Sequence, residues 1–261
     1  MPPAKKRARA YDPAKTRAAV LAQLAHLDQA ARTLTEPQLN RPTRLGDWTV
    51  RELVAHIGMA VTAIGRALAL PEPPKQDATL LDWPFATAVN AAAIDEFTRE
   101  LAGTPTDLDA IARALEDQLD RHPATRLLRT NAGAMPLADY LVTRTVELAV
   151  HTDDLNAALP EAAVPHDRQA LAAATRLLAD ALAHKAPGGS TEVRIPPYAV
   201  VQCVEGPRHT RGTPPNVVET DPLTWIRLAT GRVSWEDAKN GAGLTASGER
   251  ADLAPYLPLM S

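Results

Sequence analysis

Acidic residues that precede a histidine by four positions are the feature of this sequence with the clearest chemical potential. Side chains four apart in a helix lie on one face, so a carboxylate and an imidazole at this spacing can converge on one metal ion. The chain of 261 residues contains four such pairs: Glu52/His56, Glu147/His151, Asp180/His184 and Glu205/His209. Solvated helical pairs and ordinary helix caps have the same spacing, so spacing alone does not select a metal site.

The surroundings of the histidines favour two of them. His56 lies in the apolar segment 50–61 and His151 in a mainly apolar one, so both are expected to point into a helical core. Asp154, three positions after His151, continues the helix face of Glu147. A buried histidine is commonly a hydrogen-bonded core residue. Two histidines and one carboxylate from facing helices, however, would form a metal site with an open fourth position.

Periodic apolar residues predict helices over most of the first 160 positions. Thr49 and Glu52 form a capping-box pattern at the start of one helix, and the proline-rich segment at Pro71 ends it. Thr104 followed by Pro105 predicts the N-cap and first turn of another. The predicted helices span residues 12–34, 49–70, 85–101, 104–121 and 137–159. The expected architecture is an antiparallel helical bundle.

The pattern changes in the second half of the chain, where short β-branched runs alternate with proline, glycine and asparagine. The expected elements are a helix at 170–184, strands near 193–204, 217–218 and 243–247, and short helices at 221–230 and 234–239. The helix at 170–184 could belong to either half. The sequence therefore predicts a two-domain α+β protein, with domains over residues 12–160 and 165–261 after a basic disordered tail of residues 1–11.

Composition and charge argue against several classes of protein. Hydrophobic residues make up 45% of the chain and its net charge is −3, which argues against wholesale disorder and against a protein that coats nucleic acid. The one cysteine, Cys203, excludes an internal disulfide and a multi-cysteine zinc site. The basic start is followed by no apolar signal region, and no apolar run reaches membrane-spanning length. We therefore expect a soluble cytoplasmic protein without a nucleic-acid partner or stable membrane association.

Two segments resemble a known family. Trp48-Thr-Val-Arg-Glu-Leu-Val-Ala-His56, followed later by Glu147-Leu-Ala-Val-His151-Thr-Asp-Asp154-Leu, is similar to the actinobacterial mycothiol-dependent maleylpyruvate isomerases. That family belongs to the DinB-like superfamily of metal-binding four-helix bundles, and the resemblance covers the predicted bundle. It implies that His56, Glu147 and His151 bind zinc or another divalent metal. It also implies that Asp154 lies beside the site and that mycothiol is the cofactor.

The second half resembles another family. Residues 219–235, Glu-Thr-Asp-Pro-Leu-Thr-Trp-Ile-Arg-Leu-Ala-Thr-Gly-Arg-Val-Ser-Trp, and residues 246–253, Ala-Ser-Gly-Glu-Arg-Ala-Asp-Leu, are similar to the bacterial sterol-carrier-protein-like domain. This resemblance implies a small α+β domain of a type associated with apolar ligands in a tunnel. Trp225 and Trp235 are expected in the core of that domain. Direct contact with such a ligand is the alternative for both.

The implied chemistry is the activation of a thiol. An open zinc position can hold a thiol as its thiolate at neutral pH. Cys203 is expected to be a small buried residue of the strand-rich half, so the thiol must come from outside, and the resemblance implies mycothiol. Reversible addition of a thiolate to an activated double bond permits cis–trans isomerisation, and its attack on other electrophiles gives S-transfer. Asp154 is expected to orient His151 or to move protons, with a plain surface acid as the alternative.

Two functional hypotheses follow from these patterns. In the first, the protein is a zinc-binding, mycothiol-dependent isomerase or S-transferase that acts on a small-molecule electrophile. In the second, it is a non-catalytic carrier that binds a lipid-like or sterol-like apolar ligand in its C-terminal domain. Arg66, Arg144 and Arg227 lie near the relevant helices and are candidates for binding an acidic substrate, but the sequence does not select among them. The physiological substrate and the oligomeric state stay open at this point.

Overall fold

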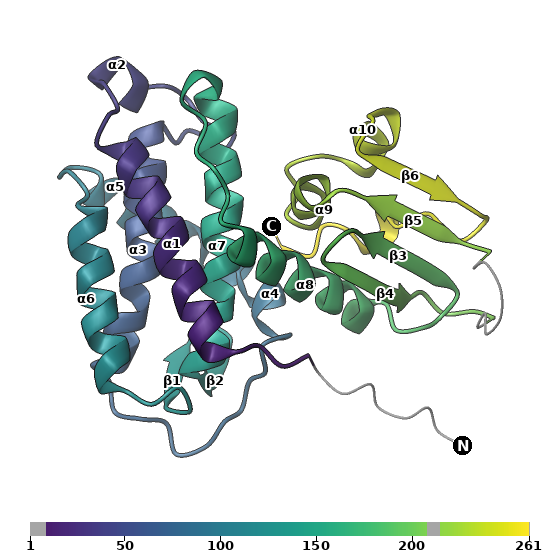
Figure 1. Cartoon of the computed structure of the whole chain (residues 1–261), viewed down its shortest axis with the longest axis horizontal. Coiled ribbons are helices and arrows are strands. Elements are labelled where there is room, and N and C mark those ends of the chain that lie inside the picture. The colour runs from purple at the N-terminus through teal and green to yellow at the C-terminus, as the bar shows by residue number, and fades with distance from the viewer. Residues whose placement is uncertain (1–8, 208–214, 261) are drawn as a thin grey trace.

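The computed structural model describes residues 9–207 and 215–260, which form a mixed α+β protein (Figure 1). The α-helices are α1 (Pro13–Ala31), α2 (Glu36–Leu39), α3 (Val50–Leu68), α4 (Trp83–Ala86), α5 (Ala91–Leu101), α6 (Leu108–Arg121), α7 (Leu137–Ala158), α8 (Arg168–Lys185), α9 (Pro222–Ala229) and α10 (Trp235–Asn240). Short 3-10 helices are η1 (Ala88–Asn90), η2 (Pro160–Ala162) and η3 (Ala254–Tyr256). The strands are β1 (Leu127–Thr130), β2 (Gly133–Pro136), β3 (Thr191–Ile195), β4 (Ala199–Cys203), β5 (Val217–Thr220) and β6 (Leu244–Ser247).

Four long helices, α1, α3, α6 and α7, pack against one another in the first half of the molecule (Figure 1). Helix α7 is central, because α1, α3 and α8 all pack against it. Its residues from Tyr140 to Leu155 are almost all buried as a result. Helix α3 buries an apolar face that includes Leu53, Ile57 and Ile64. The packed pair of α3 and α7 can therefore bring residues that are distant in the sequence together in a buried setting.

The helix ends show where local sequence signals succeed and where they mislead. At the start of α3, the Glu52 carboxylate accepts a hydrogen bond from the Thr49 backbone N–H at 2.9 Å, as the capping-box pattern predicts. The predicted start of the next long helix at Thr104 is wrong. Asp107 caps α6 instead and accepts from the Ala110 N–H at 2.9 Å. Aspartate is the better N-cap, and its charge complements the positive end of the helix dipole.

Two further features differ from the sequence prediction. The segment predicted as a single helix over 85–101 is divided into α4, η1 and α5. Its middle consists largely of alanine and threonine, which offer little apolar surface for packing. The hairpin of β1 and β2 was not predicted, because strands of four residues are too short to show alternation. It pairs the buried residues Leu128 and Met135, and Gly133 adopts a φ of +118° where the turn ends.

The second half contains a four-stranded sheet in the order β4-β3-β5-β6, in which β3 and β5 are parallel and the other pairs antiparallel. One face buries apolar side chains such as Val193, Ile195 and Val201. Helix α8 packs both on β4 and on α7, so it contributes to both halves. The Trp225 indole N–H of α9 donates to the Thr175 carbonyl of α8 at 3.3 Å. One cluster of buried apolar residues consequently runs through both halves.

The N-terminal tail expected over residues 1–11 falls mostly on residues 1–8, which lie outside the described part of the chain. Arg9, which follows them, pairs with Asp180 of α8 at 2.8 Å. Across residues 9–207 and 215–260, no helix has both the length and the apolar character needed to cross a membrane.

Candidate metal centre

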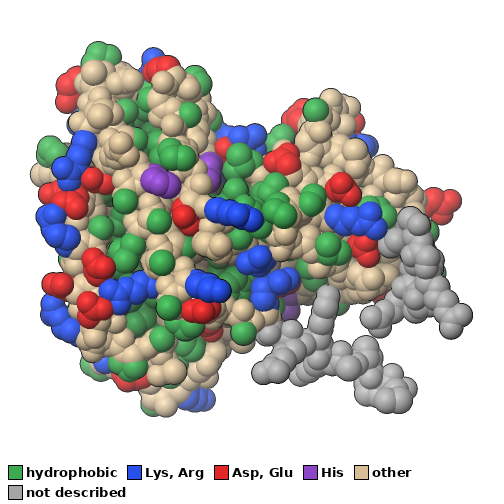
Figure 2. Space-filling view, in the orientation of Figure 1, with side chains coloured by type: hydrophobic (Ala, Val, Ile, Leu, Met, Phe, Trp, Pro, Cys, Tyr) green, Lys and Arg blue, Asp and Glu red, His purple; other side chains and the backbone are tan. Residues whose placement is uncertain are grey.

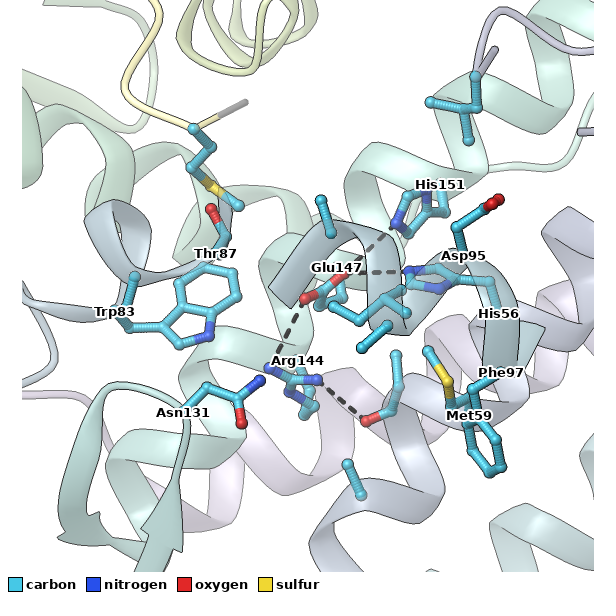
Figure 3. A pocket seen from close by; sticks show the side chains of 18 of the residues that line it. His56, Met59, Trp83, Thr87, Asp95, Phe97, Asn131, Arg144, Glu147 and His151 are labelled. Atoms are coloured by element: carbon cyan, nitrogen blue, oxygen red, sulfur yellow. Dashed lines mark hydrogen bonds and ion pairs between the residues drawn. The ribbon is translucent and has the colours of Figure 1, made fainter. Parts of the chain in front are cut away.

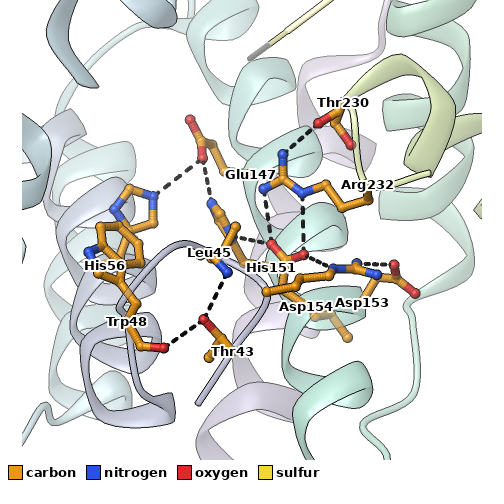
Figure 4. A network of polar contacts seen from close by, with 12 residues as sticks. Thr43, Leu45, Trp48, His56, Glu147, His151, Asp153, Asp154, Thr230 and Arg232 are labelled. Atoms are coloured by element: carbon orange, nitrogen blue, oxygen red, sulfur yellow. Dashed lines mark hydrogen bonds and ion pairs between the residues drawn. The ribbon is translucent and has the colours of Figure 1, made fainter. Parts of the chain in front are cut away.

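Three side chains that are distant in the sequence meet between α3 and α7 (Figure 4). His56 lies in the second turn of α3, and Glu147 and His151 lie one turn apart on α7. The Nε2 atoms of His56 and His151 lie 3.8 and 3.3 Å from the same carboxylate oxygen, Oε2 of Glu147. One ligand atom from each of the three residues lies within 4.8 Å of the others. The expected convergence is therefore present, and the role of these residues as metal ligands stays a prediction.

The spacing of these atoms fits a divalent transition metal. Zinc binds imidazole nitrogen and carboxylate oxygen at about 2.0–2.2 Å, so two ligand atoms of a tetrahedral ion lie about 3.4 Å apart. The observed separations of 3.3 and 3.8 Å from Oε2 of Glu147 are close to that value. The side chains of His56 and His151 are 9% and 8% exposed, so the site is shielded from bulk water. Three protein ligands would leave one position open for an outside ligand.

The carboxylate of Asp154 forms a hydrogen bond with the other ring nitrogen of His151, Nδ1. The two residues are one turn apart on α7, and His151 Nδ1 lies 2.9 Å from Asp154 Oδ2. A proton held on Nδ1 would leave the Nε2 lone pair available to a cation between His151 and Glu147, which is how partners of metal-binding histidines commonly act. Asp154 is fully buried, so the alternative interpretation as a surface acid is wrong. Burial alone would raise the pKa of Asp154, but His151 and the Arg232 guanidinium hold it well below its usual range.

A network of charged side chains surrounds Asp154 and joins both halves of the chain (Figure 4). Arg44, in the loop before α3, donates to Asp154 Oδ1 from Nε at 2.6 Å and also pairs with Asp153. Arg232, in the turn after α9, donates to Asp154 Oδ2 from Nη2 at 3.1 Å. Arg227 of α9 forms a two-point pair with Asp153 at 2.9 and 2.5 Å. The orientation of His151 thus depends, through Asp154, on Arg44 from the loop before α3 and on Arg232 from the turn after α9.

His56 is oriented by different contacts. Its ring lies against the Trp48 ring, with 5.0 Å between centroids, and edge-on to the His151 ring at 4.6 Å. The Trp48 indole N–H in turn donates to Asp95 Oδ1 of α5 at 2.5 Å. Within the described residues, His56 Nδ1 is buried and has no hydrogen-bond partner. Ring packing therefore holds this imidazole, in place of a carboxylate.

Opposing effects set the pKa values of the three clustered groups. Burial lowers the pKa of His56 below its ordinary value. Burial also acts to lower the pKa of His151, but the Asp154 and Glu147 carboxylates outweigh it and raise that pKa. Burial would raise the pKa of Glu147, yet its contacts with both histidines and the nearby Arg144 charge keep it well below the usual range. Glu147 is therefore ionised, and an ionised carboxylate accepts hydrogen bonds or binds cations through its oxygens.

The clustered residues line a cavity of about 880 Å³ (Figure 3). Its apolar walls include Met59, Trp83 and Phe97, and both halves of the molecule contribute to it. Arg232 and Met260 come from the second half. Lys and Arg side chains gather along the junction of the two halves in the space-filling view (Figure 2). The arrangement offers a partly apolar chamber that opens to solvent, with cationic groups beside the potential metal ligands.

The structure shows which of the three candidate arginines lie at the cavity. Arg66 and Arg144 line the cavity, and Arg144 lies 3.7 Å from the Glu147 carboxylate. Arg227 is absent from the cavity lining and pairs with Asp153 instead. The sequence gives no sign of Arg44 and Arg232. They lie 110 and 78 positions from Asp154, and no local spacing relates residues so far apart.

Other candidate groups lie away from this site. Cys203 is buried in β4, and burial raises the pKa of its thiol to about 11, so it is protonated at neutral pH. Asp180, from another pair with the same spacing, binds Arg9. His209 lies outside the described residues. The cluster itself therefore receives no thiolate from Cys203.

Comparison with known proteins identifies both parts of the chain. The mycothiol maleylpyruvate isomerase N-terminal domain matches residues 5–156. The chain belongs to this family. Residues 167–259 match a second family, described as the bacterial SCP ortholog. No curated protein matches the sequence.

Two crystal structures share the fold over most of the chain. The mycothiol-dependent maleylpyruvate isomerase has a TM-score of 0.56 at 16% identity, and the match covers 93% of this chain and 95% of that one. A mutant of a mycothiol-dependent maleylpyruvate isomerase has a TM-score of 0.55 at 15% identity, with the same coverage. At these identities the likeness concerns the fold.

The two matched regions divide the site between them. His56, Glu147 and His151 belong to the mycothiol maleylpyruvate isomerase N-terminal domain, as does Asp154. Arg232 belongs to the second matched region. The chamber beside the three clustered side chains is thus completed by the region that follows the isomerase-type domain.

Proposed function

We propose that this protein is a zinc-binding, mycothiol-dependent enzyme that acts on a small-molecule electrophile, as an isomerase or an S-transferase. The observation that carries the proposal is the convergence of two imidazoles and one carboxylate on the wall of a cavity. Membership in the mycothiol maleylpyruvate isomerase N-terminal domain family supports mycothiol as the thiol.

Each residue of the site has a distinct part in this proposal. His56, Glu147 and His151 would hold the ion, and Asp154 would keep the Nδ1 proton of His151 in place. A divalent zinc ion held there would lower the pKa of a bound thiol and keep it as a thiolate at neutral pH. The apolar walls would exclude water from the electrophile, and the cationic groups would favour an anionic thiolate.

The same site supports two reactions. When a thiolate adds to an activated double bond, the bond becomes single and can rotate before the thiolate leaves again, which isomerises the substrate. When the electrophile instead loses a leaving group, the thiol stays attached and the product is a thioether. Both reactions begin with the same nucleophile, and the shape of the cavity does not decide between them.

We also propose the finer organisation expected from the sequence. Helices α1, α3, α6 and α7 would form the DinB-like antiparallel four-helix bundle, and residues 12–160 and 165–261 would form separate domains. The boundaries of the two family matches support this division. Helix α8 packs against both α7 and β4, so it would join the two domains. The absence of a nucleic-acid partner and of stable membrane association, and a cytoplasmic location, stay predictions from the sequence.

Metal content is the first test. We expect about one zinc ion per chain in the purified protein by elemental analysis, and none in H56A or E147A. The matched control is H184A, because Asp180 and His184 have the same spacing on α8 but lie away from the cluster. Equal metal content in wild type and E147A would contradict the proposed centre.

Thiol dependence is the second test. We expect the zinc-loaded enzyme to isomerise maleylpyruvate, or to conjugate a chlorodinitrobenzene, with mycothiol and not with glutathione. Activity on the first substrate identifies an isomerase and on the second an S-transferase. Equal rates with mycothiol and glutathione would contradict mycothiol dependence. So would the absence of activity with mycothiol on either substrate.

The carrier hypothesis has less support in the structure. Trp225 and Trp235 both belong to the continuous hydrophobic core, and the apolar face of the sheet packs on α8. Mass spectrometry of an organic extract of the purified protein tests it directly. A stoichiometric lipid together with the absence of zinc would favour the carrier over the enzyme.

A further inference from the structure

The two oxygens of the Glu147 carboxylate face different groups (Figure 3). Oε2 is the atom that lies 3.3 Å from His151 Nε2 and 3.8 Å from His56 Nε2. Oε1 points away from both histidines, toward Arg144, whose Nη2 lies 3.7 Å from it. The carboxylate is therefore divided between the imidazole pair on one side and a guanidinium on the other.

Arg144 is fixed in its place by several contacts. The side chain is 5% exposed and lies between two rings, 4.5 Å from the Tyr140 centroid and 5.6 Å from the Trp83 centroid. Its Nε and Nη2 atoms donate to Thr143 Oγ1 at 3.1 and 2.9 Å. The guanidinium plane is thus set before any ligand arrives, which is the property that distinguishes arginine from lysine.

Arg144 also connects the two helices that carry the clustered side chains. It lies one turn before Glu147 on α7, and its Nη1 donates to the Ala60 carbonyl at 3.0 Å. Ala60 lies one turn after His56 on α3. The same guanidinium therefore contacts the backbone of one ligand-bearing helix and faces the carboxylate of the other.

Burial makes the charge of Arg144 costly unless an anion lies nearby. Among the described residues, Glu147 is the one acidic side chain that forms an ion pair with it. A residue that served packing alone would not need a charge between Tyr140 and Trp83, and an apolar side chain of similar length would fill that space at lower cost. The ion pair with Glu147 therefore gives the buried charge a partner at the clustered side chains.

We propose that Arg144 is a positioning residue that reserves Oε1 of Glu147 for itself and so leaves Oε2 as the single oxygen that binds the metal. This inference rests on the proposed metal centre. Single-oxygen binding would keep the coordination number low and preserve the open position that an external thiol must occupy. Without the guanidinium, the carboxylate could turn and present both oxygens to the ion.

Cobalt(II) substitution tests this inference without measuring catalysis. Four-coordinate cobalt(II) absorbs visible light much more strongly than five- or six-coordinate cobalt(II), so the spectrum reports the number of ligand atoms. We expect R144M, which keeps the length and removes the guanidinium, to show a weaker visible band. Chelator competition should show zinc affinity about 10–100-fold lower, the range found when the partners of metal ligands are removed.

Two further variants make the result specific. R144K keeps a positive charge and should recover part of the lost affinity and of the band intensity. R66M removes a cavity arginine that contacts Thr62 and the Met59 carbonyl but no clustered side chain, so its metal affinity and spectrum should match the wild type. If R144M does not fold, the inference is decided by R144K, whose spectrum must then differ from that of the wild type.

The outcomes separate this inference from the proposed function. A wild-type protein that binds no metal overturns the metal centre and the inference together. A wild type that binds one metal ion, with R144M giving the same cobalt spectrum, overturns the role of Arg144 and leaves the proposed function standing; where R144M does not fold, an unchanged spectrum in R144K has the same meaning. A changed spectrum in R144M but not in R66M supports it.

Discussion

The two imidazoles of the candidate metal centre are held by opposite means. On the α7 side, the Nδ1 atom of His151 meets a buried carboxylate, which is itself paired with Arg44 and Arg232. On the α3 side, His56 lies against the Trp48 ring, and its Nδ1 has no partner among the described residues. The His151 flank, which comprises His151 and Asp154, is thus held by charged contacts. The His56 flank, which comprises His56 and Trp48, is held by ring packing.

The difference shows which of the two imidazoles has its orientation fixed more strictly. Hydrogen bonds and ion pairs are directional, so they fix both the tautomer and the ring plane of His151. Ring packing restricts the plane of His56 without choosing a tautomer. We therefore expect changes on the His151 flank to affect metal binding more strongly than changes on the His56 flank.

Removing His151 itself should have the largest effect. We expect H151A to lose stoichiometric metal binding, because two protein ligands remain, while it stays folded. Asp154 keeps its pairs with Arg44 and Arg232 in this variant, so the cost should be about 1–3 kcal/mol of unfolding free energy. Elemental analysis and circular dichroism measure the two properties. Unfolding of H151A would show that this histidine is primarily a core residue.

The next largest effect is expected from D154N, which tests the charged flank without touching a ligand. The amide cannot reproduce the ion pairs or fix the Nδ1 proton, so metal affinity should fall about 10–100-fold. Loss of a partner from the buried pair should also cost about 3 kcal/mol of stability. Chelator competition and urea unfolding are the measurements.

Asp153 provides the matched control for D154N. It pairs with Arg44 and Arg227 but contacts neither histidine. D153N should therefore lose stability while its metal affinity stays close to that of the wild type. Equal losses of affinity in D153N and D154N would mean that the network acts as a whole, and that the contact with His151 has no special role.

The smallest effect is expected from W48F on the other flank. The phenyl ring can still pack against His56, so metal affinity should fall by less than about tenfold. Loss of the hydrogen bond from the indole to Asp95 should lower the stability only slightly, because Asp95 is close to solvent. Chelator competition and urea unfolding measure these two effects. A loss of affinity as large as that of D154N would abolish the distinction between the flanks.

Much of the fold follows from local signals in the sequence. The cap formed by Thr49 and Glu52 and the apolar periodicity of α3 and α7 predict both helices that carry the clustered residues. Thr104 was misleading because Asp107, three positions later, is a stronger N-cap. The hairpin of β1 and β2 escaped prediction since pairing between strands of four residues leaves little periodicity.

The convergence of His56, Glu147 and His151 could be expected from the sequence, whereas their surroundings could not. The spacing leaves four pairs open, the apolar settings favour His56 and His151, and the family resemblance adds Glu147 to them. Arg44, Arg144 and Arg232 could not be placed in the same way. Their partners are fixed by the packing of α3, α7 and the turn after α9, and a long flexible side chain gives no periodic signal of its eventual partner.

The last described residues have a practical consequence for work with this protein. The backbone N–H groups of Leu259 and Met260 both donate to the Ala229 carbonyl, which places Met260 in the cavity lining. A bulky group attached to the chain close to Met260 is therefore expected to change access to the chamber. A group attached at Arg9 would avoid this interference, because Arg9 contacts Asp180 and lies outside that lining.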